Sequence, residues 1–156
     1  MTYRIQGLSP EPFRPLFGLP DAALAERQAL RVTADDAFGF PCRITLEDAA
    51  PGETLILLNH VSQEAATPYR ASHAIFVREG VHEPAVYVDE PPPVFALRTL
   101  SLRGFDAEGM MLDARIAAPG EAEAGIRALF EQPGIAEIHA HSATRGCFVA
   151  RIERTA

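Results

Sequence analysis

Alternating apolar and polar positions near the end of the chain predict a β-hairpin. Residues 135–141 alternate small or apolar side chains with polar ones, which is the period-two pattern of a half-buried strand. Residues 146–152 read as a second strand, and the intervening segment 142–145 suits a tight return, with Gly146 able to take a positive φ. Side chains two positions apart share a face of a strand, so Glu137, His139 and His141 should lie together.

Charge selects a register for this hairpin. Placing Glu137 opposite Arg151 forms an opposite-charge cross-strand pair, and the same register sets His141 opposite Cys147. Shifting the pairing by two residues would set Glu137 against Glu153, which is an unfavourable like-charge contact. We therefore expect one hairpin face to present two histidines, a carboxylate and a thiol.

The remaining pattern predicts an α+β fold. The apolar run 54–58 is typical of a central strand buried on both faces, and Ala122, Ile126, Leu129 and Phe130 form one stripe of a helix over 121–130. Further strands are expected at 3–8, 30–33, 42–46, 74–77, 97–102 and 110–116, with a helix over 20–27 and a short one after Ser9. The sum is one domain over residues 1–156, with about seven or eight mostly antiparallel strands and two or three helices.

Composition places the chain among ordinary globular proteins. A chain of 156 residues with 47% hydrophobic content buries enough surface to fold without a metal or disulfide staple. No apolar run approaches the roughly 18 residues of a membrane-spanning helix, and no secretory signal opens the sequence. We expect a cytoplasmic protein without a membrane partner, in which Cys42 and Cys147 remain free thiols.

The charged residues exclude several function classes. A net charge of −7 argues against nucleic-acid binding, which usually needs a basic patch. All 14 basic residues are arginine, so lysine nucleophiles, Schiff bases and P-loops are excluded. Arginine binds carboxylates and phosphates through a planar fork, so a small anionic molecule remains a possible partner.

Four short motifs resemble a bacterial family known as domain of unknown function 1203. They are Pro41-Cys42-Arg43, Tyr69 with Ile75-Phe76-Val77-Arg78, Leu102-Arg103-Gly104-Phe105-Asp106 and Gly146-Cys147-Phe148. Gly-Pro often precedes the Ile-Phe-Val segment in the family pattern, whereas His73-Ala74 stands there in this chain. The resemblance implies a fold-level grouping and carries over no activity, cofactor or catalytic residue.

Two candidate catalytic chemistries use the hairpin. His139 and His141 aim two imidazoles in the same direction, and Glu137 could complete a zinc or iron site, as could Cys147, His60 or His73. Alternatively, Cys147 acts as a nucleophile with His141 or His139 as its base. Two histidines on a strand are more often a solvated face, and a free cysteine is more often a small buried hydrophobe.

A third hypothesis is a binding module rather than an enzyme, and we favour it over the other two. Arginines beside strand ends and turns, helped by one tyrosine, would hold a carboxylate or phosphate. The residues are Arg43, Tyr69, Arg70, Arg103 and Arg145. The competing interpretation is that these arginines form structural salt bridges with the 21 acidic residues.

Overall fold

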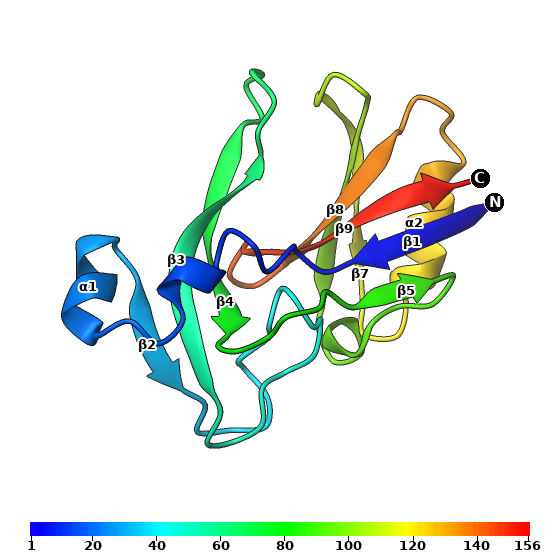
Figure 1. Ribbon diagram of the computed structural model, residues 1–156. Helices are drawn as coiled ribbons and strands as arrows, with labels where there is room; N and C mark the ends of the chain where they lie inside the picture. The colour runs from blue at the N-terminus through cyan, green and yellow to red at the C-terminus, as the bar shows by residue number, and fades with distance from the viewer.

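Nine strands form two antiparallel sheets in the computed structural model, which describes residues 1–156 (Figure 1). The six-stranded sheet has the order β5-β1-β9-β8-β6-β7, and the three-stranded sheet has the order β2-β3-β4. The first contains β1 (Thr2–Gln6), β5 (Val86–Val88), β6 (Leu100–Phe105), β7 (Met111–Ala117), β8 (Glu137–Ser142) and β9 (Phe148–Thr155). The second contains β2 (Leu30–Thr33), β3 (Thr54–Gln63) and β4 (Ala71–Arg78). The α+β prediction is confirmed, with more strands than expected.

Two α-helices lie where the sequence predicts them. They are α1 (Asp21–Glu26) and α2 (Ala122–Phe130), and two 3-10 turns, η1 (Arg14–Leu16) and η2 (Pro93–Phe95), complete the helical elements. The predicted apolar stripe of α2 enters the largest core cluster, against the six-stranded sheet. Gly125 permits this approach, because a Cβ there would lie 2.7 Å from Leu102 Cδ1. None of the helices is long and apolar enough to cross a membrane.

The predicted central strand is confirmed and is longer than expected. β3 lies between β2 and β4, and Leu55 and Ile56 are fully buried on its opposite faces. The strand continues to Gln63, so His60 lies within it rather than at its end. Figure 1 shows β3 and β4 as a long hairpin that stands beside the six-stranded sheet.

The prediction of a strand over 42–46 is wrong, because this segment folds into a turn. Cys42 Sγ accepts backbone N–H bonds from Ile44 at 3.4 Å, Thr45 at 3.5 Å and Arg78 at 3.3 Å. The Cys42 carbonyl also accepts the N–H of Leu46, which has a φ of 55°. These local bonds compete with a strand ladder. The sequence also missed β5, and β6 begins at Leu100 rather than at residue 97.

The C-terminal hairpin forms, but the predicted register is wrong. Glu137 lies opposite Glu153 and His139 opposite Arg151, and a bulge after Ala140 sets His141 opposite Phe148. Arg151 offsets the like-charge contact, because its guanidinium bonds to Glu137 and lies 3.0 Å from Glu153 Oε1. An intervening cation thus stabilises the register that direct pairing disfavours.

The two sheets meet along β9, β4 and the segment that contains Arg43. The Arg43 N–H donates to Phe76 O at 3.0 Å, and the Arg43 carbonyl accepts the Leu8 N–H at 2.8 Å. At the far tip, Thr67 Oγ1 donates to Gly109 O at 3.1 Å, which links the β3–β4 and β6–β7 turns. Hydrogen bonds therefore link the two sheets at both ends of their junction.

Gly7→Ala should destabilise the fold at this junction. A Cβ at Gly7 would lie 1.9 Å from Ile44 O, and that carbonyl already accepts the Ala85 N–H. Because backbone atoms must move, we expect the free energy of unfolding in urea to fall by roughly 2 to 3 kcal/mol. Gly134→Ala is the control, because its Cβ meets only Leu112 Cδ1 at 3.1 Å. Equal losses in the two variants would contradict this packing.

Candidate functional site

Four of the five histidines gather between the two sheets. His60 and His73 lie opposite each other on β3 and β4, and His139 and His141 face them from β8. The ring centroids are 4.9 Å apart for His73 and His141, and 6.5 Å apart for His139 and His141. We call these four residues the histidine cluster.

Packing keeps the imidazole of His141 neutral. The ring is 2% exposed and packs against Phe148, with centroids 5.8 Å apart. Burial lowers the pKa of His141 to about 3, although its hydrogen bond to Gly146 O acts in the opposite direction. A carbonyl can only accept, so Nδ1 carries the proton in this 2.9 Å bond. Burial also lowers the pKa values of His60 and His73.

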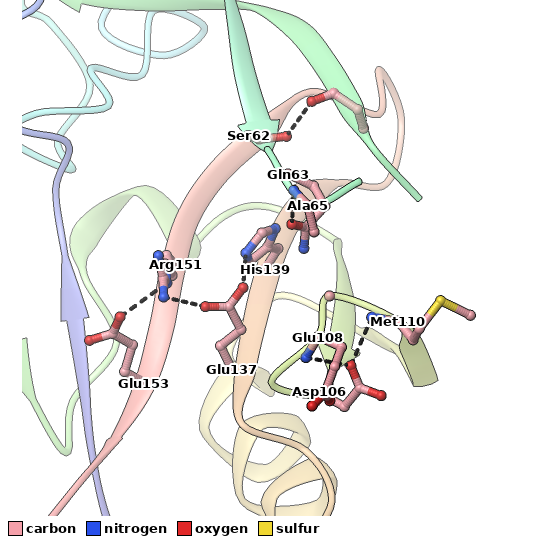
Figure 2. Close-up of polar contacts among 12 residues, drawn as sticks. Ser62, Gln63, Ala65, Asp106, Glu108, Met110, Glu137, His139, Arg151 and Glu153 are labelled. Carbon is pink, nitrogen blue, oxygen red and sulfur yellow. Dashed lines mark hydrogen bonds and ion pairs between the residues drawn. The ribbon is translucent and has the colours of Figure 1, made fainter. Parts of the chain in front are cut away.

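His139 belongs to a charged network that Figure 2 shows in one view. Its Nε2 lies 3.0 Å from Glu137 Oε1, and Arg151 joins Glu137 to Glu153. Burial favours the neutral form of Glu137, but the bond to His139 and the charge of Arg151 outweigh it and lower the Glu137 pKa. His139 Nδ1 has no hydrogen-bond partner, and the side chain is 2% exposed between Phe105 and Phe148. The network orients His139 inside the protein.

Glu137, His139 and His141 do not form a complete set of metal ligands in the structure. Glu137 does lie beside His139, but it acts as a hydrogen-bond and ion-pair partner. No group of three or more His, Cys, Asp or Glu side chains is placed to hold a metal ion. Metal binding by Glu137, His139 and His141 therefore stays a prediction.

A cavity of about 540 Å³ lies on another part of the sheet junction. Its wall comes from β3, β4, the segment before β6, the β8–β9 turn and the loop that leads to Arg43. No Asp or Glu lines it, whereas three arginines do. The lining residues are Phe38, Gly39, Pro41, Arg43, Leu57, Ala74, Phe76, Leu97, Arg98, Thr99, Ser142, Thr144, Arg145, Cys147 and Val149. We call this the arginine cavity.

Arg43 is a buried cation without a carboxylate partner. Its side chain is 4% exposed, and Nε donates to Phe148 O at 2.8 Å while Nη1 donates to Pro41 O at 2.6 Å. These bonds leave Nη2 without a protein acceptor. Burial lowers the pKa of Arg43 to about 10, which still leaves the guanidinium charged at pH 7.

The other two arginines differ in their pairing. Arg98 forms a bidentate pair with Asp48, at 2.6 and 2.9 Å, and lies 4.4 Å above the Phe38 ring. Arg145 is exposed on the β8–β9 turn and makes no ion pair. Arg43 and Arg145 therefore supply positive charge to the cavity that no carboxylate of the protein neutralises.

The structure brings together only part of the predicted anion site. Arg43 and Arg145 line the cavity, and Cys147 joins them. Arg103 lies opposite His139 with its Nε 3.3 Å from Ser101 Oγ, so it belongs to the histidine face. Tyr69 packs against Phe105 near the β3–β4 tip, and Arg70 Nη1 donates to Glu64 O.

Arg98 was missed by the sequence analysis. Its partner Asp48 lies 50 residues away in the chain, and no local motif connects the two. A solitary arginine within the strand predicted over 97–102 was the only available signal.

The structure separates Cys147 from the histidines. His141 pairs with Phe148, whereas the backbone of Cys147 accepts the N–H of Ser142, and Cys147 lines the arginine cavity. Its Sγ has only a weak contact with Arg145 O, at 4.0 Å, and no hydrogen bond to an imidazole. A dyad of Cys147 with His141 or His139 is therefore not formed, because the bulge turns the thiol to another face.

Comparison with known proteins confirms the resemblance seen in the sequence. The chain belongs to the family described as "Protein of unknown function (DUF1203)", whose model matches residues 39–154. This range contains the histidine cluster and all lining residues of the arginine cavity except Phe38. Neither the curated proteins nor the solved structures give a match.

The histidine cluster should make the protein sensitive to acid. Since the folded-state pKa of His141 is about 3 and the unfolded value is about 6.5, the unfolded chain binds the extra proton below pH 6.5. Stability is therefore lost as the pH falls from about 6.5 towards 3, with a slope of about 1.4 kcal/mol per pH unit for this group.

Urea unfolding between pH 6.5 and 5 measures this slope while most carboxylates remain ionised. His141→Asn should reduce the slope by about 1 kcal/mol per pH unit. His82→Asn is the control, because His82 is exposed and lies outside the cluster. An unchanged slope in His141→Asn would contradict this account of the cluster.

Proposed function

We propose that this protein binds a small amphipathic anion, a carboxylate or phosphate with an apolar body, in the arginine cavity. The observation that carries the proposal is the buried guanidinium of Arg43, which lacks a carboxylate partner and lines a cavity without acidic residues. A buried charge without a counterion is costly, so an anionic ligand would supply the missing partner.

The geometry around Arg43 leaves hydrogen-bond donors for an anion. Two carbonyl acceptors, from Pro41 and Phe148, hold the guanidinium in place, and Nη2 retains its donors. A fixed guanidinium with free donors can bind a carboxylate or phosphate without first losing rotational freedom. Arg145 adds an exposed positive charge to the same cavity.

The rest of the cavity favours an apolar body on the ligand. Leu57 and Phe76 from the three-stranded sheet and Val149 from β9 contribute apolar surface. The hydroxyl side chains of Thr99, Ser142 and Thr144 can orient further polar groups. A volume of about 540 Å³ lies within the range of small-molecule sites.

A matched pair of ligands tests the charge requirement. Hexanoate should raise the thermal unfolding midpoint more than hexanamide, because only the carboxylate pairs with the arginines. At a hundredfold excess over Kd, binding adds about 2.7 kcal/mol to the free energy of unfolding. Acetate should have a smaller effect than hexanoate, because it lacks the apolar body.

Two arginine variants test whether the stabilisation by hexanoate arises from binding in the arginine cavity. Arg145→Gln should weaken the effect of hexanoate, since its charge faces the cavity without a protein partner. Arg70→Gln should leave the effect unchanged, because Arg70 lies at the β3–β4 tip outside the cavity. Equal stabilisation by hexanoate and hexanamide, or equal loss in both variants, would contradict the proposal.

A further inference from the structure

The thiol of Cys147 opens on the arginine cavity and is the protein's accessible cysteine. It lies half-buried directly before β9, next to Phe148, whose carbonyl holds the Arg43 guanidinium at 2.8 Å. A thiolate at Cys147 favours the charged form of Arg43 and so opposes the lowering of the Arg43 pKa by burial. Reactive cysteines occupy electropositive, partly exposed surroundings of this kind.

Cys42 provides an internal contrast. It is fully buried, and its Sγ accepts three backbone N–H bonds, from Ile44, Thr45 and Arg78. The thiol is therefore part of the turn structure and has no access to solvent. Any selective thiol chemistry of the folded protein should occur at Cys147.

We propose that Cys147 is a site of reversible mixed-disulfide formation with a low-molecular-weight disulfide that carries carboxylate groups. The inference rests on the proposed anion binding, because the same cavity would attract the carboxylates. Arg43 supports this site independently of the cysteine. Its guanidinium is 4% exposed, lacks a counterion and lines the same cavity.

The chemistry is thiol–disulfide exchange. Cys147 loses its proton to solvent, and the thiolate attacks one sulfur of the reagent R–S–S–R. A bond forms between Cys147 Sγ and that sulfur, the reagent S–S bond breaks, and the second sulfur leaves as R–S⁻ and takes a proton from solvent. The Cys147 sulfur is oxidised and the leaving sulfur is reduced, so electrons balance between protein and reagent. Excess R–SH reverses the reaction.

The positive cavity predicts a dependence on reagent charge. Three aliphatic disulfides differ mainly in charge: 3,3′-dithiodipropionate is a dianion, bis(2-hydroxyethyl) disulfide is neutral and cystamine is a dication. Each rate on the folded protein is divided by the rate on the urea-unfolded protein, which removes the intrinsic reactivity of the reagent. Mass spectrometry of the intact chain and its peptides identifies the modified cysteine.

We expect the normalised rate at Cys147 to be at least about tenfold higher for the dianion than for the dication, with the neutral reagent between them. The preference should shrink as salt is added. Arg145→Gln should also reduce it, whereas Arg115→Gln should not, because Arg115 is exposed on β7 outside the cavity.

The outcomes separate this inference from the proposed function. Equal normalised rates for the three reagents, or modification of Cys42 instead of Cys147, would overturn the inference. If hexanoate stabilises the protein but Cys147 shows no charge preference, anion binding stands and the thiol proposal fails. If the charge preference is present but hexanoate and hexanamide act alike, ligand binding fails and the cavity remains a site that directs thiol exchange.

Discussion

The structure depends on one residue that connects its two sheets. The backbone of Arg43 donates to Phe76 on β4 and accepts from Leu8, while its side chain donates to Phe148 at the start of β9. Removing this side chain would leave the Phe148 and Pro41 carbonyls without their donors at the centre of the junction. The protein thus keeps a buried positive charge where an apolar residue would cost less desolvation energy. We infer that the charge has a use beyond holding the sheets together.

The junction carries two different polar environments. In the histidine cluster, burial holds the imidazole of His141 neutral, and Glu137 has both a hydrogen bond to His139 and an ion pair with Arg151. In the arginine cavity, by contrast, Arg43 and Arg145 have no carboxylate partner. Arg103 beside the histidines also has no carboxylate partner, but it is only half-buried, whereas Arg43 is buried and lines a cavity without acidic residues. This contrast is why the proposed binding site lies in the cavity rather than at the histidines.

The two cysteines have the same side chain but different roles in the fold. Cys42 turns the chain because its sulfur accepts three backbone N–H groups, and burial removes it from solvent. Cys147 lies at the opposite end of the sequence but reaches the same junction, where the β8–β9 turn exposes it to the cavity. Arg43 connects the two cysteines, because it follows Cys42 directly in the chain and its side chain donates to the carbonyl of Phe148, the residue after Cys147.

Local patterns in the sequence determined the α+β class, α2 and its buried stripe, the central position of β3 and the existence of the C-terminal hairpin. These features follow from periodicity and turn residues, which act over a few neighbouring positions. Tertiary structure alone decided the hairpin register, because Arg151 bridges Glu137 and Glu153 and a bulge shifts His141 onto Phe148. It also decided the cavity, where Arg43, Arg98 and Arg145 come together from segments that no local pattern connects. Charge compensation and cavity formation depend on contacts between distant segments, and no short stretch of sequence encodes them.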